Sequence, residues 1–108
     1  MLVLSRCVGE GIHVGDTFVV KVADIQHDCV ELSFSFTALT RFLLPEWRIL
    51  PLDQEIVTRR KNEGVRIGNG IEILVVAIRP QGELSARVRL GINAQPDVAI
   101  HRTELGST

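Results

Sequence analysis

Hydrophobic and polar residues alternate along most of this chain with the period of two that a half-buried β-strand shows. The clearest run extends from Cys29 to Phe36, where every second residue is strongly hydrophobic. Shorter apolar runs, at residues 2–6, 12–14 and 18–22, are separated by glycine-containing turns. The pattern predicts short antiparallel strands joined by tight turns.

The same pattern occurs twice at one constant offset, which indicates an internal repeat. The sequence VLSR at residues 3–6 returns as IVTR at 56–59, EGIHVGD at 10–16 returns as EGVRIGN at 63–69, and residues 20–25 return at 73–78. The second copy continues through a longer polar connection (79–86) and a strand from Arg87 to Ile92, and it closes with a fifth strand over residues 98–102. We therefore expect one compact all-β domain over residues 1–108, with repeats at 1–37 and 54–108.

The first copy has no clear fifth strand. Residues 38–53 contain Pro45 and Pro51, and proline cannot donate to a strand ladder. We expect an irregular or partly helical connector there, with Trp47 and its apolar neighbours packed on the core.

Composition limits the classes of function. The net charge is −1, so a polyanion would have to be bound by a local cationic patch. No apolar stretch is long enough to span a membrane, and Cys7 and Cys29 lack metal-site spacing and are expected to be reduced thiols in a cytoplasmic protein. We expect no cofactor, no metal site and no catalytic residues: the Asp24–Cys29 cluster is interpreted as a solvated turn, and no base is placed to activate Cys7.

Two pairs of residues suggest a binding surface. Leu4 and Arg6 are two apart on one predicted strand, and Ile100 and Arg102 are two apart on another, so each pair shares a face. An apolar side chain supports the face of an unstacked base, while an arginine reaches phosphate or guanine acceptors. An isolated arginine at a strand edge more often serves solubility.

The sequences MLVLSRCVGEGIHVGD and GINAQPDVAIHRTEL resemble the carbon storage regulator family of CsrA-like bacterial translational regulators. The resemblance implies interleaved five-stranded subunits, here as a single-chain pseudo-dimer, and RNA binding without catalysis. It implies recognition of GGA motifs in hairpin loops of mRNA leaders or small RNAs, with control of translation or message stability. By position it assigns an RNA site to Leu4, Arg6, Asn93, Ala94, Val98, Ala99, Ile100, His101 and Arg102.

A second, weaker site would combine Val57 and Arg59 with Arg48 of the connector, where Glu46 would bring a carboxylate near phosphate groups. We expect this site to be weak or dead, and the chain to be a monomer. Two alternatives stay open at this point: a protein-interaction module with reduced RNA binding, and one family unit with a long insertion that dimerises. His101 either contacts RNA or lies on the other face of the sheet.

Overall fold

The computed structural model describes residues 1–15, 18–36, 56–67, 70–79 and 86–103. Trp47, Arg48 and the rest of the predicted connector lie outside these residues. The described strands of the first half are β1 (Leu2–Arg6), β2 (Gly11–Val14), β3 (Phe18–Ile25) and β4 (Cys29–Phe36). Those of the second half are β5 (Ile56–Arg60), β6 (Gly64–Ile67), β7 (Ile71–Arg79), β8 (Arg87–Asn93) and β9 (Ile100–Arg102).

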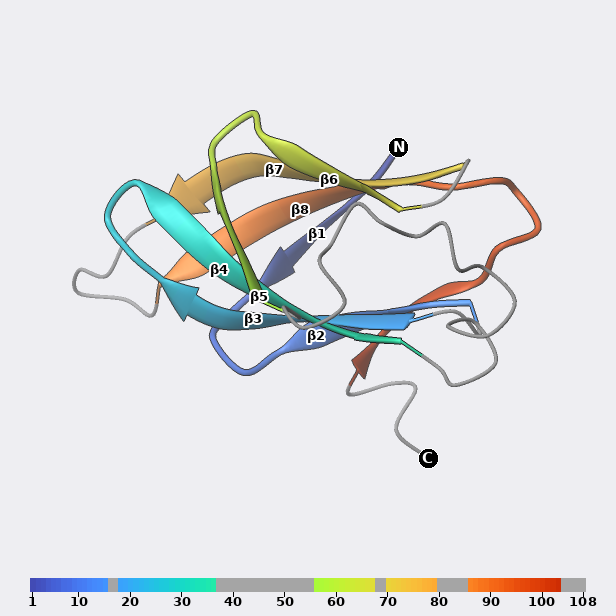
Figure 1. Ribbon diagram of the computed structural model, residues 1–108, viewed down its shortest axis with the longest axis horizontal. Helices are drawn as coiled ribbons and strands as arrows, with labels where there is room; N and C mark the ends of the chain where they lie inside the picture. Colours follow the sequence, from blue (N-terminus) through green and yellow to red (C-terminus); the bar gives the residue numbers. More distant parts are fainter. Residues whose placement is uncertain (16–17, 37–55, 68–69, 80–85, 104–108) are drawn as a thin grey trace.

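The strands form two antiparallel sheets that pack face to face (Figure 1). One sheet has the order β1-β8-β7-β6, and the other has the order β5-β4-β3-β2-β9. The all-β prediction is therefore confirmed. The last strand is shorter than expected, because β9 begins at Ile100 and residues 98 and 99 precede it. No helix among the described residues is both long and apolar enough to cross a membrane.

The two halves of the chain exchange their outer strands. β1 leaves its own half and pairs with β8, while β5 pairs with β4 and β9 pairs with β2. Each sheet thus contains a β-meander from one half and at least one edge strand from the other half. Residues at opposite ends of the sequence are consequently brought close together.

The core lies between the sheets and is built from the alternating apolar residues that the sequence shows. Directly opposed residues such as Leu4 and Leu90, or Val20 and Phe34, project from the same face of their sheet. Phe18 and Phe34 are in ring contact, with centroids 5.8 Å apart. The buried apolar set, drawn from both sheets, is Ile12, Val14, Phe18, Val20, Val22, Ile25, Val30, Leu32, Phe34, Val65, Ile67, Ile73, Val75, Val88, Leu90 and Ile92.

The internal repeat is reproduced in the backbone. The turn between β1 and β2 has Gly9 at φ +88°, and the equivalent turn between β5 and β6 has Asn62 at φ +71°. Glycine and asparagine are the residues that most readily adopt this left-handed conformation. In both halves the strand register shifts at the same point, between Val22 and Asp24 in β3 and between Val75 and Ala77 in β7.

Candidate nucleic-acid interface

The strand register determines which side chains of β1 and β9 face the interior. Leu4 and Arg6 lie opposite the buried residues Leu90 and Val88. Ile100 and Arg102 likewise lie opposite Val14 and Ile12, which are fully buried. All four predicted site residues therefore project from the inner faces of the sheets, at an edge of each sheet.

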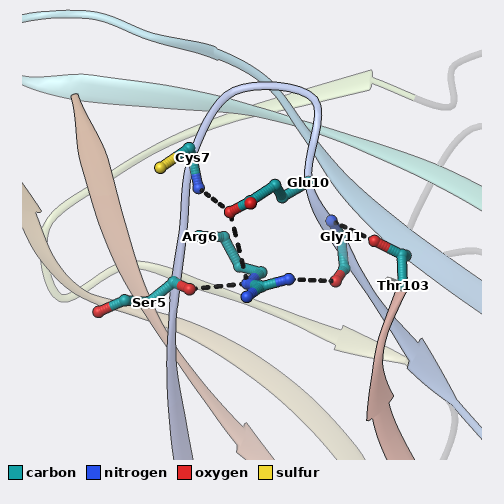
Figure 2. A network of polar contacts seen from close by, with 6 residues as sticks. All are labelled: Ser5, Arg6, Cys7, Glu10, Gly11 and Thr103. Carbon is teal, nitrogen blue, oxygen red and sulfur yellow. Dashed lines mark hydrogen bonds and ion pairs between the residues drawn. The ribbon is translucent and has the colours of Figure 1, made fainter. Parts of the chain in front are cut away.

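The guanidinium of Arg6 is held inside this edge (Figure 2). Its Nε donates to the carbonyl oxygen of Ser5 at 2.7 Å, and its Nη1 donates to that of Gly11 at 3.4 Å. The Glu10 carboxylate lies 3.9 Å from Nε and also accepts a hydrogen bond from the backbone N–H of Cys7. Arg6 is only 5% exposed, whereas the strand pattern led us to expect that its guanidinium would reach a ligand. Its observed contacts are with the protein.

Gly11 connects β1 to β9. Its carbonyl oxygen accepts the hydrogen bond from Arg6, and its N–H donates to Thr103 Oγ1 at 3.2 Å (Figure 2). β1 and β9 belong to different sheets and do not pair with each other, yet Arg6 at the end of β1 and Thr103 just after β9 both bond to this glycine. We call the β1–β2 turn, with the adjoining ends of β1, β2 and β9, the first corner.

The remaining predicted site residues fall into two groups. Leu4, Ala94, Val98 and Ile100 are partly buried and pack against the core. Asn93, Ala99, His101 and Arg102 are exposed. Leu4, Ile100 and Arg102 lie on β1 and β9, close to the first corner, and Arg102 carries a full positive charge. Asn93 lies opposite Glu72 at the other end of β8, so the structure does not bring it to this corner.

His101 lies on the outer face of its sheet. It pairs directly with His13 of β2, whereas its neighbour Arg102 pairs with inward-facing Ile12. Of the two orientations that the sequence left open, the structure has the outer one. Its part in RNA binding stays a prediction.

The equivalent β5–β6 turn, with the ends of β5 and β6, forms a second corner. Arg59 Nε donates to the carbonyl oxygen of Gly64 at 2.9 Å, and its Nη1 donates to that of Thr58 at 2.8 Å. Val57 packs against the core, as Leu4 does. Arg48, the third residue of the predicted second site, lies outside the described residues.

Metal and thiol chemistry finds no support among the described residues. They contain no group of three or more metal-ligating side chains. Both cysteines are free thiols. Burial raises the pKa of the Cys29 thiol above its ordinary value, and the carboxylates of Asp28, Glu31 and Asp24 act in the same direction against the opposing effect of Arg60. These effects disfavour the thiolate, which is the reactive form of a cysteine.

Comparison with known proteins decides the family. The model of the CsrA global regulator protein family matches residues 1–38 and 56–108. The chain belongs to this family. The family is described as one of global regulators, and the expected resemblance is thereby confirmed.

Several relatives carry the name translational regulator CsrA. The protein from Caldicellulosiruptor bescii is 37% identical over 75 residues, which cover 69% of this chain and 85% of the relative. Those from Rhodopirellula baltica and Hydrogenovibrio crunogenus are 42% and 46% identical over 50 residues, and each match covers 46% of this chain and 64% of the relative. No solved structure matches the chain significantly.

Sequence reasoning missed the residues that hold the first corner together. Glu10 and Gly11 were treated only as a turn, and Thr103 was given no role. The repeat carried a signal, because Glu63 and Gly64 recur at the equivalent positions. Thr103 has no such signal, since its contact with Gly11 joins positions that are 92 residues apart.

Proposed function

We propose that this CsrA-family chain is a sequence-specific RNA-binding regulator that acts on mRNA in the cytoplasm. It recognises GGA-type motifs in single-stranded loops of mRNA leaders or small RNAs and thereby controls translation or message stability. The relatives named as translational regulators support this function. The observation that supports the proposal is that Arg6 of β1 and Thr103, which follows β9, both bond to Gly11, so the ends of the first and last strands lie close together.

Each side chain of the first corner has a distinct part in this proposal. Leu4 and Ile100 are half-buried and backed by the core, so they form a firm surface for the face of an unstacked base. Exposed Arg102 supplies the planar fork that fits phosphate oxygens or the acceptor edge of guanine. Arg6 is a positioning residue, because its guanidinium holds the end of β1 against Gly11.

The proposal is tested by an electrophoretic shift assay with a GGA hairpin and the same hairpin changed to CCA. We expect the GGA hairpin to bind at least tenfold more tightly, since each good guanine contact contributes about 1–3 kcal/mol of discrimination. Arg102→Ala should remove most of this preference, while Lys61→Ala, at an exposed position of the β5–β6 turn, should leave it unchanged. Equal binding of both hairpins to the unmodified chain would refute sequence-specific recognition.

We further propose that the chain acts as a monomeric pseudo-dimer. β1, β5 and β9 each pair with a strand from the other half of the same polypeptide. These three strands therefore do not need to come from a second chain. Light scattering should give a mass near 12.0 kDa that does not change with concentration. A concentration-independent mass of twice that value would favour the dimeric alternative with a long insertion.

A protein-interaction module is the second candidate function. It is favoured by the exposed apolar residues along the first strand and its turn: Met1, Leu2, Val3 and Val8. The salt dependence of RNA binding separates the two functions. A true RNA site loses affinity steeply as salt rises, by about 0.7 log units per log unit of salt for each phosphate contacted on a single strand. Weak binding that does not depend on salt would favour the interaction module.

A further inference from the structure

A pocket of about 450 Å³ lies on the outer face of the β1-β8-β7-β6 sheet, away from the inward-facing residues of the first corner. Its lining among the described residues is Ser5, Ala77, Ile78, Arg79, Arg87 and Arg89. Ser5, Arg89 and Ala77 lie opposite one another on three neighbouring strands. Their sequence neighbours Leu4, Val88 and Ile78 face inwards. Because successive side chains of a strand point to opposite faces, the three residues project outwards.

Three positive charges gather around this pocket. Arg79, Arg87 and Arg89 are all exposed, and Arg79 lies directly opposite Arg87 in the β7–β8 ladder. The ion pairs seen among the described residues, Arg6–Glu10 and Arg66–Glu72, involve none of them. Like charges directly opposite each other destabilise a sheet, and a bound anion would relieve this repulsion.

The equivalent surface of the first half carries the opposite charge. In the second half, Arg89 pairs with Ser5 on one side and Ala77 on the other. The equivalent residue of the first half is Glu31, which pairs with Thr58 and Asp24. Asp24 and Glu31 are direct partners in the β3–β4 ladder, so two carboxylates lie side by side at this position. A face that only had to be solvated could carry charges of either sign. The two copies therefore differ in the ligands that their outer faces can attract.

We propose that the arginine-lined pocket is a phosphate-binding site. The planar guanidinium group forms paired hydrogen bonds with phosphate oxygens, and the Ser5 hydroxyl adds a neutral donor. The volume falls within the range of small-molecule sites, so the pocket has room for more than one phosphate group.

Two sources can supply these phosphate groups. One is a free phosphorylated molecule. The other is the backbone of an RNA bound at the first corner, because Ser5 and Arg6 are neighbours on β1 and β1 is an edge strand that a ligand can pass around. This second source rests on the function proposed above, whereas the first does not.

The test compares two triple variants that remove the same charge. The pocket variant carries Arg79→Gln, Arg87→Gln and Arg89→Gln. The control variant carries Arg60→Gln, Lys61→Gln and Arg66→Gln, all at exposed positions outside the pocket lining. Thermal unfolding should show both variants folded, since the pocket variant is relieved of an unfavourable like-charge pair. If the pocket variant is unfolded, Arg89→Glu, which introduces the residue type found at the equivalent position of the first half, replaces it in every assay.

Two probes separate the sources. Isothermal titration with tripolyphosphate should show binding to the unmodified chain and to the control variant, and affinity at least tenfold weaker for the pocket variant. In salt titrations with the GGA and CCA hairpins, the log–log slope of the pocket variant should be smaller by about 0.7 for each phosphate group that the variant no longer binds.

Each outcome has one interpretation. Weaker binding of tripolyphosphate alone identifies a free phosphorylated ligand, and weaker binding of the hairpins, with or without weaker binding of tripolyphosphate, identifies the RNA backbone. A pocket variant that matches the control variant with both probes overturns the phosphate site. The proposed function is tested separately, by the preference of the unmodified chain for GGA over CCA. If the unmodified chain binds both hairpins equally, the proposed function fails, even when the pocket variant binds both hairpins more weakly.

Discussion

The two corners of the molecule contain the same contacts at equivalent positions and differ in what lies against them. In both, an arginine donates to the carbonyl oxygens of its preceding residue and of a glycine five residues ahead. In both, a glutamate accepts a hydrogen bond from the backbone N–H three residues before it. These contacts therefore belong to the construction of each repeat and do not by themselves make an RNA site.

The first corner is distinguished by β9. Thr103 at the end of this strand accepts the hydrogen bond from the Gly11 N–H, and Arg6 is buried. Arg59, its counterpart in the second corner, is only partly buried, and no strand pairs with the outer edge of β6 among the described residues. The added strand, rather than the arginine, therefore separates the proposed binding corner from its copy.

The largest expected effect comes from replacing the two equivalent glycines. A Cβ on Gly11 would lie 2.5 Å from the Val20 carbonyl oxygen and 3.1 Å from the Thr103 side chain, and a Cβ on Gly64 would lie 2.6 Å from the Ile73 carbonyl oxygen. Gly11→Ala should lower the free energy of unfolding by about 3 kcal/mol, at the upper end of overpacking costs, and Gly64→Ala by less. Urea unfolding measures both. Equal decreases would show that β9 adds nothing to the first corner.

Replacing the two arginines should give a smaller but more unequal effect. Arg6→Ala removes charge-assisted hydrogen bonds from a buried site and should cost about 2 kcal/mol of stability. Arg59→Ala should cost about 1 kcal/mol or less, because water can replace its hydrogen bonds at a partly exposed site. Thermal unfolding at matched pH and salt is the measurement. A larger cost for Arg59→Ala would reverse the assignment of the two corners.

The smallest expected effect concerns the bond between β9 and Gly11. Thr103→Val keeps the shape of the side chain but removes the acceptor for the Gly11 N–H, which should cost about 1 kcal/mol. Thr58→Val is the matched control, since Thr58 is exposed on β5. Amide hydrogen exchange should show faster exchange at Gly11 in Thr103→Val alone. Unchanged protection at Gly11 would show that another contact holds β9 in place.

Much of the fold was predictable because strand formation leaves a local signal. The alternation through Val30, Leu32 and Phe34 and the repeated turns gave the strands, and the recurrence of the Glu-Gly turn gave the two halves. The resemblance to the CsrA family gave the interleaved arrangement, which no local pattern specifies. The length of β9 was overestimated, because residues 98 and 99 have strand-like composition but belong to the approach to the strand.

The candidate site was harder to predict, because exposure depends on contacts between distant parts of the chain. Period-two alternation correctly placed Arg6 and Leu4 on one face, yet it could not show that Gly11 and Glu10 would enclose the guanidinium. The same alternation puts Arg87 and Arg89 on one face of β8, but the sequence did not show that Ser5 of β1 would lie next to them.

Isothermal titration of the chain with a short GGA hairpin tests most directly whether the first corner is the RNA site and the second is not. We predict one hairpin per chain, binding free energy weakened by about 1–3 kcal/mol in Arg102→Ala, and a much smaller change in Arg59→Ala. Two hairpins bound per chain with similar affinity, or equal changes in the two variants, would contradict this assignment.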